Sequence, residues 1–362
     1  MNILYIANLG DNKASGVNIV VPQHMKFQSK YANIGFYNFR NISMPIDPSV
    51  QVLSSSENTE FNLAKLPDPF NHPDLVVFHD IFSCLKFCKV AKKLYKMSIP
   101  YVIVPHGSFT HNAIKRRRTK KIVALHTILR TLVYKSNAVQ YLTEDELNNS
   151  YVKNKSIIIP NGTIIPKKLN LKGKRTNNIS FVSIGRKDIY HKGIDLLLEA
   201  CEVAADVFRK NGATLTLYGP DLNGSFAKIN KMISDFNISD FVFNKDGIFG
   251  QEKERVLKSE SVFVLTSRLE GQPLSLLEAC AYELPVLVTP GTNVSKEVLD
   301  FECGWVASQS KESIADKMTY IINHPQEIEK CSKNAYDYVS GMYSWEKVAA
   351  KTIEEYKALI NH

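Results

Sequence analysis

The chain has 362 residues, 44% of them hydrophobic and 22% charged, and a formal net charge of +9. This length favours two domains over a single core, and the composition is that of a globular protein in water. No window holds the roughly 18–20 apolar residues that a membrane-spanning helix needs. The first apolar run is too short for a signal peptide, so we expect a cytoplasmic protein. The positive charge predicts anionic partners without choosing among phosphates, nucleic acid and a membrane surface.

The potential metal ligands of the sequence are scattered. The six cysteines do not complete a zinc pattern, and we expect them to be buried free thiols in a reducing compartment. Acidic pairs and histidine clusters at a spacing suited to a divalent metal are missing from the sequence. We therefore expect neither a metal site nor a bound cofactor.

Apolar strand-like runs alternate with helical stretches in the first half of the chain. Strands are predicted at 3–7, 74–79, 101–104, 138–142 and 156–159, and helices at about 20–31 and 81–96. Residues 40–73 hold five prolines and are expected to form loops with short strands. Nearly continuous apolar runs are typical of strands that a parallel sheet buries on both faces.

The same alternation returns in the second half, after an interruption at Pro160-Asn161-Gly162 and a Lys- and Asn-rich run. Strands are predicted at 179–184, 214–218, 241–243, 261–265 and 285–288, helices at 195–210, 225–236, 251–259 and about 344–360, and a short element at 296–299. Alternating strands and helices are typical of βαβ units. We predict an α/β fold with Rossmann-like domains at residues 1–165 and 179–343, joined by a linker at 166–178, with their strand ends facing each other across a cleft.

The stretch from Ser267 to Ala279 follows a predicted strand and opens a helix. Pro273 suits the first helical position, where a missing N–H costs nothing. The unpaired N–H groups at such a helix start bind anions, and Glu270 and Glu278 would flank them. This arrangement suits a ligand with hydroxyls on either side of a phosphate, such as a nucleotide-sugar. Taken alone, an ordinary βα unit with solvated glutamates near a helix start explains the stretch equally well.

Other polar residues also follow predicted strands. Arg186 and Lys192 come after strand 179–184, where they could neutralise a pyrophosphate and stabilise the charge that grows on a departing nucleoside diphosphate. His106 follows strand 101–104 in a Pro-His-Gly turn that directs it out of the sheet. Gly16 lies in the first βα loop, where the lack of a side chain lets the backbone approach a phosphate.

Together these residues resemble the retaining glycosyltransferases of family 4, which have the GT-B fold. The resemblance is carried, in the family's order and spacing, by Gly185-Arg186, Lys192-Gly193, Tyr218-Gly219-Pro220, Glu270-x7-Glu278, His106-Gly107 and Pro160-Asn161-Gly162. It implies a metal-independent hexosyltransferase that moves a sugar from a nucleotide-diphosphate sugar, with UDP favoured over GDP and the anomeric configuration retained. The acceptor would be a hydroxyl of a glycan or of a polyprenyl-diphosphate-linked acceptor, in surface polysaccharide assembly.

The resemblance also implies roles for single residues. Arg186 and Lys192 would hold the donor diphosphate. Glu270 would bind the hydroxyls of the transferred sugar, Glu278 the nucleotide ribose, and His106 would contact the sugar near the reacting carbon. The remaining donor-binding positions would be Gly16, Gly185, Gly219, Gly271, Gln272, Pro273 and Leu274.

The chain departs from the family pattern at three places and follows it at its terminal helix. Ser15-Gly16 stands where two adjacent glycines are frequent, Gln272-Pro273 stands where Phe-Gly is frequent, and Thr163-Ile164 follows the Asn-Gly pair without the family's aspartate. Pro273 thereby removes one backbone N–H from the donor-binding loop. The helix near Tyr343-Ser344-Trp345 resembles the family's terminal helix, residues 344–362 here, which crosses back onto the first domain.

A basic segment precedes a stretch with helical apolar periodicity. Its cations are Lys115, Arg116, Arg117, Arg118, Lys120 and Lys121, and apolar residues at 122, 125, 129 and 132 define one helical face. Cations at a helix start oppose its dipole. One interpretation is contact with an anionic membrane surface or a pyrophosphate-linked lipid, and the other is a solvated charge run beside a core-packing face. Nucleic acid is not expected, because no binding motif or aromatic interleaving accompanies the charges.

Two other functions fit the same residues. A GT-B-type epimerase would act on the nucleotide-sugar itself, and its product would form without any acceptor. A nucleotide-sugar-binding protein would bind the donor without turnover. The presence of both glutamates, both cations and His106 favours an enzyme over a binding protein with a degenerate site.

Overall fold

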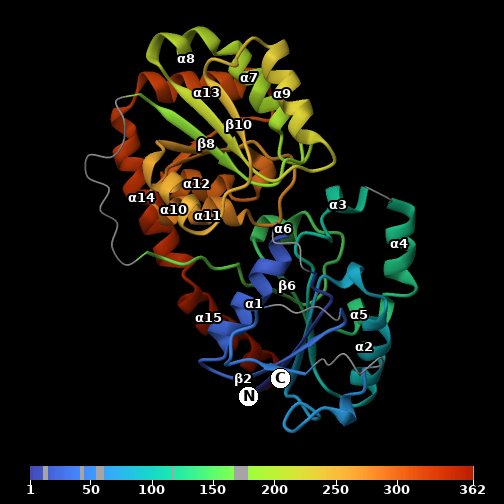
Figure 1. Cartoon of the computed structure of the whole chain (residues 1–362). Helices are drawn as coiled ribbons and strands as arrows, with labels where there is room; N and C mark the ends of the chain where they lie inside the picture. Colours follow the sequence, from blue (N-terminus) through green and yellow to red (C-terminus); the bar gives the residue numbers. More distant parts are fainter. Residues whose placement is uncertain (11–14, 41–44, 54–60, 116–117, 167–177, 362) are drawn as a thin grey trace. The chain divides into compact units, whose positions relative to one another are not determined.

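The computed structural model of the chain describes residues 1–10, 15–40, 45–53, 61–115, 118–166 and 178–361 (Figure 1). The chain divides into two compact units. The first contains Met1–Gly162 together with Trp345–His362, and the second contains Thr163–Ser344. The boundary falls a few residues before the predicted one, and most of the predicted linker, residues 167–177, lies outside the described residues.

The first unit is built on a seven-stranded parallel sheet in the order β3-β2-β1-β4-β5-β6-β7. Its strands are β1 (Asn2–Ala7), β2 (Asn33–Asn38), β3 (Gln51–Val52), β4 (Leu75–His79), β5 (Tyr101–Val104), β6 (Ala138–Tyr141) and β7 (Ser156–Ile158). Its helices are α1 (Gly16–Gln28), α2 (Lys86–Lys96), α3 (His111–Lys115), α4 (Arg118–His126), α5 (Arg130–Tyr134), α6 (Glu144–Asn148) and α15 (Trp345–Ile360). Short 3-10 turns lie at Leu63–Lys65 and Ile81–Ser83.

Strand β2 is the main element of the first unit that the sequence did not predict. Its apolar run is interrupted by Gly35, which weakens the strand pattern. In the structure a Cβ at Gly35 would lie 2.7 Å from Phe70 and 2.8 Å from Leu53, so the glycine makes room for these two core side chains. The helix expected at 20–31 begins and ends earlier, as α1, and the helix expected at 81–96 divides into a 3-10 turn and α2.

The second unit has a six-stranded parallel sheet in the order β10-β9-β8-β11-β12-β13. Its strands are β8 (Ser180–Ile184), β9 (Thr214–Tyr218), β10 (Val242–Lys245), β11 (Val262–Leu265), β12 (Val286–Val288) and β13 (Gly304–Val306). Its helices are α7 (Ile194–Val203), α8 (Ala205–Asn211), α9 (Ser225–Asp235), α10 (Gly250–Ser259), α11 (Leu274–Ala281), α12 (Ser295–Asp300), α13 (Lys311–Asn323) and α14 (Gln326–Met342), with a 3-10 turn at Pro290–Thr292.

Both faces of this second sheet are buried. Val262 and Val264 of β11 belong to one hydrophobic cluster, whereas Phe263 and Leu265 belong to another. Successive side chains of a strand point to opposite faces, so helices must cover both sides. The predicted helix 195–210 is interrupted at Ala204, and β13, α13 and α14 were not predicted as separate elements.

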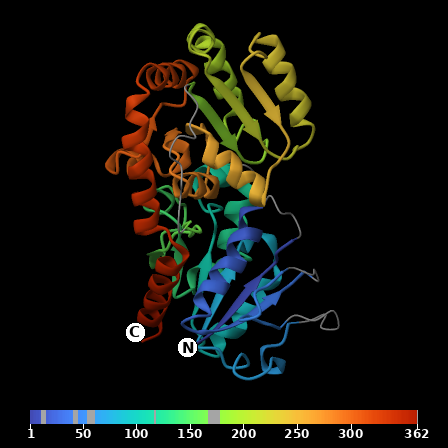
Figure 2. The ribbon, with the colours of Figure 1, turned by 60° about the vertical axis from the view of Figure 1, so that its left-hand side comes forward.

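Helix α15 follows the second unit in sequence but packs in the first, alongside α1 (Figures 1 and 2). The Trp345 ring contacts His24 edge-on at a centroid distance of 4.8 Å and stacks on Phe27 at 5.8 Å. Farther along the helix, the Tyr356 hydroxyl donates a 2.6 Å hydrogen bond to Gln140 of β6. A Cβ at Gly162 would lie 2.6 Å from the Trp345 ring, so Gly162 is the residue that lets this ring dock.

Substitution Gly162→Ala should therefore destabilise the first unit by about 1–3 kcal/mol, the usual cost of overpacking a filled core. The measurement is urea unfolding followed by Trp345 fluorescence in a Trp305→Phe background, since these are the two tryptophans of the chain. Gly341→Ala is the control, because a Cβ there meets no atom within 4 Å. An unchanged unfolding midpoint for Gly162→Ala would contradict the proposed packing role of this glycine.

Candidate functional site

At the carboxyl edge of the second sheet, neighbouring loops touch through main-chain atoms. A Cβ at Gly193 would lie 2.0 Å from the Thr266 carbonyl oxygen, and one at Gly291 would lie 2.3 Å from that of Ser267. A Cβ at Gly219 would lie 1.8 Å from the Gly185 carbonyl oxygen. These distances are shorter than any side chain allows, so glycine is required at all three positions. The close packing holds the loops after β8, β11 and β12 against one another.

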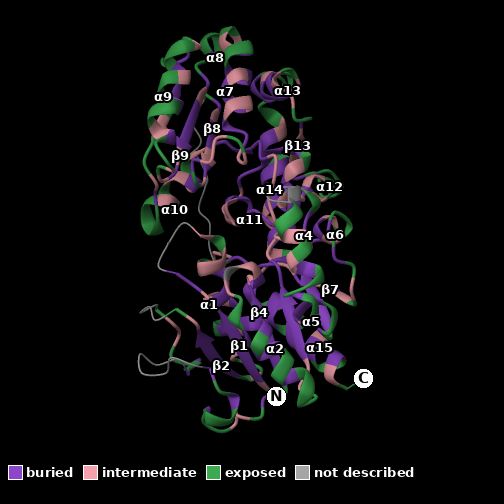
Figure 3. Ribbon diagram, turned by 90° about the vertical axis from the view of Figure 1, so that its right-hand side faces the viewer, coloured by how far each residue is buried: buried purple, intermediate pink, exposed green. Residues whose placement is uncertain are grey.

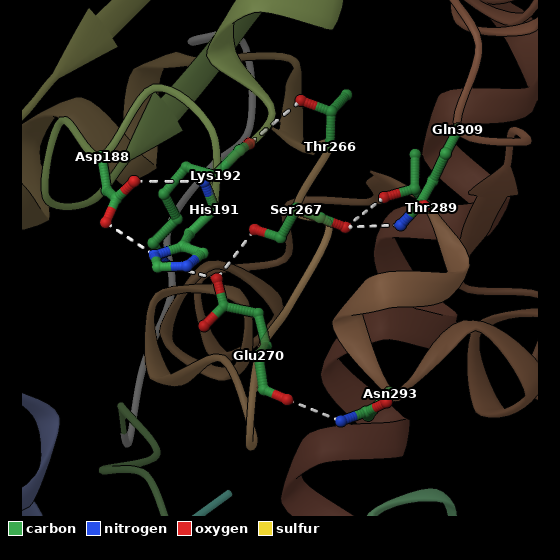
Figure 4. A network of polar contacts seen from close by, with 9 residues as sticks. All are labelled: Asp188, His191, Lys192, Thr266, Ser267, Glu270, Thr289, Asn293 and Gln309. Carbon is green, nitrogen blue, oxygen red and sulfur yellow. Dashed lines mark hydrogen bonds and ion pairs between the residues drawn. The ribbon is translucent and has the colours of Figure 1, made fainter. Parts of the chain in front are cut away.

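Glu270 lies in the loop after β11 and is held by both its side chain and its backbone (Figure 4). Its Oε1 atom accepts a hydrogen bond from Ser267 Oγ at 2.7 Å and another from Lys192 Nζ. Its backbone N–H donates to Gly291 O at 2.9 Å, and Asn293 Nδ2 donates to its carbonyl oxygen at 2.6 Å. Neither side-chain contact uses Oε2. The carboxylate is therefore fixed in place, and Oε2, which has no hydrogen-bond partner among the described residues, can accept from a ligand.

Lys192 reaches Glu270 from the turn that leads into α7. The backbone N–H of Lys192 donates to Asp188 O at 2.9 Å, and the Asp188 carboxylate accepts from the backbone and the ring of His191 at 3.1 and 2.7 Å. A Cβ at Gly185 would lie 3.5 Å from Lys192 Cε, an ordinary van der Waals contact, so the lysine chain passes directly over this glycine. The side chains of Lys192 and Glu270 are 17% and 14% exposed, which makes this a partly desolvated ion pair.

Arg186 lies on the same loop as Lys192 but is exposed. Among the described residues its guanidinium forms no salt bridge. Of the two cations predicted after β8, Lys192 is paired with Glu270 and Arg186 faces solvent. Next to Arg186 in the sequence, Lys187 is buried, donates to Lys245 O at 2.6 Å and lies over the Phe226 ring. Burial lowers the pKa of Lys187 to about 8.

Helix α11 begins one residue later than the sequence predicts. Pro273 is its N-cap, in extended conformation, and the helix starts at Leu274. The N–H groups of Leu276 and Leu277 donate to Pro273 O, so the N–H groups of Leu274 and Ser275 lie at the open helix start. Gln272 and Pro273 are buried beside them, whereas Gly271 and Leu274 are partly exposed. The loop and helix start thus keep the predicted order, with two backbone donors next to Glu270.

Glu278 lies on the second turn of α11 and is paired with a residue that was not predicted. Lys253 of α10 donates from Nζ to Glu278 Oε2. The Glu278 and Lys253 side chains are 35% and 23% exposed. In the sequence Lys253 lies in a run of alternating charges that is typical of a solvated helix face, so no local signal separates it from its neighbours. Each of the two predicted glutamates is therefore neutralised by a lysine.

In the first unit, His106 lies just beyond β5 in a strained turn. Its φ angle is +50°, which is uncommon for a residue with a side chain, and Gly107 follows at +81°. His106 Nε2 lies 2.9 Å from Nδ1 of the buried His79, the last residue of β4. Burial, together with the nearby His24, lowers the pKa of His106 to about 3. His106 is thus a neutral imidazole at physiological pH, and His79 is a partner that the sequence did not reveal.

A buried carboxyl group supports the backbone of this turn. Glu146 of α6 is fully buried and accepts hydrogen bonds from the N–H groups of Gly107 and Leu142 at 2.6 and 2.7 Å. Burial raises the pKa of Glu146 to about 7, and these two hydrogen bonds only partly offset that effect. Glu146 therefore anchors the residue next to His106, and its protonation changes within the neutral pH range.

The other site residues predicted for the first unit are placed as follows. Gly16 is the first residue of α1, and a Cβ there would meet no atom within 4 Å. Lys115 ends α3 and Arg118 begins α4, while Arg116 and Arg117 lie outside the described residues. Lys120 is exposed, and Lys121 donates to Ala113 O at 2.7 Å. Each unit is described by itself, so the predicted cleft stays a prediction.

The apolar face that follows the basic segment packs inside the first unit. Leu125, Leu129 and Leu132 are buried in its hydrophobic cluster, with Ile122 packed against it. This observation confirms the core-packing interpretation of that face.

Among the described residues, no three His, Cys, Asp or Glu side chains gather as a metal-binding group. In the same part of the chain, no helix is both long and apolar enough to cross a membrane.

Residues 165–338, the stretch that holds both lysine–glutamate pairs, match the family described as glycosyl transferases group 1. The chain contains a group 1 glycosyltransferase domain. The predicted family relationship is thereby confirmed at the level of this group. The matched stretch includes the candidate donor-binding residues of the second unit, from Gly185 to Glu278.

Curated relatives of this glycosyltransferase domain share about a quarter of its residues. An MMP alpha-(1->4)-mannosyltransferase of Mycolicibacterium hassiacum is 26% identical over 52% of the chain and 44% of its own length. A poly(ribitol-phosphate) alpha-N-acetylglucosaminyltransferase of Staphylococcus aureus is 29% identical over 44% of the chain and 32% of its own length. The chain thus aligns with less than half of either relative.

Solved structures match the whole fold. Sucrose-phosphate synthase from Thermosynechococcus elongatus superposes with a TM-score of 0.74 at 16% identity, covering 99% of both chains. The Anabaena HepE protein, solved in complex with UDP and glucose, gives a TM-score of 0.72 at 16% identity over 99% of this chain and 100% of its own. The predicted GT-B fold is confirmed as two α/β units, each with a parallel sheet.

Replacing the buried carboxyl of Glu146 should change how the stability of the first unit depends on pH. The folded pKa of about 7 lies above the ordinary value of 4.5, so the contribution of this group to stability is present below about pH 4.5 and is lost as the pH rises through 7. In Glu146→Gln this titration is absent. The unfolding free energy of the variant relative to wild type should therefore rise by up to about 3 kcal/mol from pH 4.5 to 7.5.

Urea unfolding at a series of pH values, followed by Trp345 fluorescence in the Trp305→Phe background, measures this difference. Glu144→Gln is the matched control, because Glu144 is exposed on the same helix. Its pH profile should run parallel to that of the wild type. A parallel profile for Glu146→Gln would show that Glu146 does not titrate in this range.

Proposed function

We propose that the chain is a retaining hexosyltransferase that moves a sugar from a nucleotide-diphosphate sugar to an acceptor hydroxyl. The observation that carries this proposal is the Lys192–Glu270 pair beside the start of α11, within a group 1 glycosyltransferase domain. One ammonium, one carboxylate with a free oxygen, and two backbone donors lie together there. The ammonium and the backbone donors match the diphosphate of a nucleotide-sugar. The carboxylate matches its hydroxyls.

The positive groups of this site would stabilise the leaving group. When the bond between the sugar and the diphosphate breaks, negative charge grows on the diphosphate oxygens. Lys192, the exposed Arg186 and the N–H groups at the start of α11 can all face that charge without prior reorganisation. We propose that transfer therefore needs no metal ion, and that the leaving diphosphate itself accepts the proton of the acceptor hydroxyl.

The two glutamates would orient the rest of the donor. Glu270, with Oε1 held by Ser267 and Lys192, can accept from sugar hydroxyls through Oε2. Glu278 would accept from the ribose hydroxyls, with Lys253 fixing its other oxygen. The buried Gln272-Pro273 pair shapes the loop between the sugar and the helix start. His106 would contribute a neutral imidazole to the sugar from the first unit.

The donor and acceptor classes are also proposals. UDP is favoured over GDP, in line with the complexes of HepE with UDP. Relatives named for alpha-mannosyl and alpha-N-acetylglucosaminyl transfer support a hexose-type sugar. We propose as acceptor a hydroxyl of a glycan or of a polyprenyl-diphosphate-linked glycan, as the family resemblance implies. Such a reaction belongs to surface polysaccharide assembly. A thermal-shift screen of UDP-, GDP- and ADP-sugars identifies the donor, because a bound ligand raises the melting temperature.

With the donor identified, Lys192→Ala should lower kcat about 10²- to 10³-fold, since it removes a charge that stabilises the transition state. Lys231→Ala is the control, because Lys231 is exposed on α9 and pairs with Asp235. Activity should persist in excess EDTA. Sugar transfer by Lys192→Ala at the wild-type rate would refute the assigned role.

The same assay separates the two alternative functions. Product analysis without an acceptor reveals a GT-B-type epimerase, because a new nucleotide-sugar then accumulates. Tight donor binding with neither transfer nor slow hydrolysis identifies a binding protein. Either outcome would replace the transferase proposal while leaving the fold unchanged.

We further propose that a basic face of the first unit contacts an anionic membrane surface. Residues 81–143 contain 13 lysines and arginines and no aspartate or glutamate. All five lysines of α2 are exposed, as are Lys120, Arg130 and Lys135 of the α4–α5 region (Figure 3). Exposed apolar side chains lie on the same segments, namely Leu85, Tyr95, Met97, Val123, Ile128 and Tyr134. Cations interspersed with apolar groups favour an anionic lipid surface over nucleic acid.

Charge reversal on α2 tests this face. The triple variant Lys92→Glu, Lys93→Glu, Lys96→Glu should bind vesicles of phosphatidylglycerol and phosphatidylcholine at least about tenfold more weakly, since each cation near such a surface contributes about 1 kcal/mol. Lys228→Glu with Lys231→Glu on α9 of the second unit is the control. Equal vesicle binding by all three proteins, or preferential binding to oligonucleotides, would overturn the membrane proposal.

A further inference from the structure

Two histidines, the buried His79 and the partly buried His106, meet at the carboxyl edge of the first sheet. β4 and β5 are neighbouring parallel strands, and His79 at the end of β4 is opposite Val104 at the end of β5. His106 follows two residues later, and its ring lies 5.2 Å from that of His79 with an interplanar angle of 28°. A face of the His79 ring stacks on Tyr5 at 5.2 Å. The His79 ring is therefore held by stacking on Tyr5 and by the contact of its Nδ1 edge with His106.

The contact between the two rings requires one donor and one acceptor. Each neutral imidazole carries a single N–H, on either Nδ1 or Nε2. Burial, together with His106 and His24, holds the pKa of His79 well below its ordinary value, so both rings are neutral at physiological pH. The 2.9 Å contact between His79 Nδ1 and His106 Nε2 can then be made in two ways. Either His79 donates from Nδ1, or His106 donates from Nε2.

Nε2 of His79, the ring nitrogen that does not contact His106, decides between the two hydrogen-bond arrangements. Nε2 of His79 is buried and has no hydrogen-bond partner among the described residues. If His106 donated, His79 would carry its proton on Nε2, and a buried N–H would be left without an acceptor. Orphaned buried N–H groups are rare in native proteins, whereas an unused acceptor is tolerated more often. The arrangement with the His79 proton on Nδ1 avoids the orphaned donor.

We propose that His79 is a positioning residue that fixes the tautomer of His106, so that His106 presents Nδ1–H as a hydrogen-bond donor. Since His106 Nε2 accepts from His79, the single proton of the His106 ring must be on Nδ1. His106 then offers a donor to an oxygen atom of a ligand and cannot accept a proton at that nitrogen. This inference rests on the proposed function only in taking that oxygen to belong to the transferred sugar.

His24 provides an internal comparison in the same unit. Its Nε2 lies 3.3 Å from Asn161 Oδ1, which can only accept, and its Nδ1 lies 3.5 Å from Gln28 Nε2, which can only donate. His24 must therefore carry its proton on Nε2, opposite to the assignment for His106. One spectrum of the protein should contain both tautomers.

The test is a two-bond ¹⁵N–¹H correlation spectrum of the full chain labelled with ¹⁵N-histidine, in which protonated and bare ring nitrogens differ widely in shift. Wild-type His106 should show a protonated Nδ1, and His24 a protonated Nε2. The variant His79→Phe keeps a ring to stack on Tyr5 but has no donor, so the His106 shifts should move toward a mixture of tautomers. His79→Asn places an amide N–H near the former Nδ1 and should restore the wild-type shifts.

Transfer activity provides a second readout. His79→Phe should lower kcat/KM about 3- to 10-fold, the effect of one misplaced neutral hydrogen bond, and His79→Asn should recover most of it. A protonated Nε2 on wild-type His106, or unchanged His106 shifts in His79→Phe, would overturn the positioning role. The expected shifts without any change in kcat/KM would support that role for His79 and refute the role proposed for His106 toward the sugar.

Discussion

Main-chain contact between loops is the constraint on which the candidate site of the second unit depends. The carbonyl oxygens of Gly185, Thr266 and Ser267 each face a glycine at a distance that no Cβ could occupy. The separation of the main chains that carry Lys192 and Glu270 is therefore set by backbone contacts, which do not depend on rotamers. Side chains that are long and flexible in solution reach a defined geometry because the loops that carry them are in direct contact.

Pairing each glutamate with a lysine has an electrostatic consequence. In the Lys192–Glu270 pair both side chains are partly desolvated, so removing either partner would leave an unpaired charge at a cost in free energy. The proposed diphosphate would not need to displace Glu270 from Lys192, because an ammonium group has three donors. The site would thus gain a dianion while keeping its own carboxylate neutralised, and exposed Arg186 would supply the additional positive charge.

Most of the sheet strands could be predicted because parallel strands buried on both faces have continuous apolar runs, such as those at 101–104 and 214–218. Strand β2 could not be predicted, because the sequence does not show that Gly35 is needed to make room for the side chains of Phe70 and Leu53. Arg186, Lys192, Glu270 and Glu278 could be predicted as site residues from their place after a strand or near a helix start and from family spacing. Lys253, His79 and Glu146 were not, because each acts on a site residue that is distant in sequence.

The packing of α15 in the first unit determines the order in which the protein can be completed during synthesis. Residues Met1–Gly162 leave the ribosome first, but the helix carrying Trp345 and Tyr356 follows only after the entire second unit has been made. Until then, the surfaces of His24, Phe27 and Gln140 that this helix covers stay open to solvent. The nascent first unit therefore resembles a folding intermediate with exposed apolar surface, the state in which chaperones bind proteins of this size.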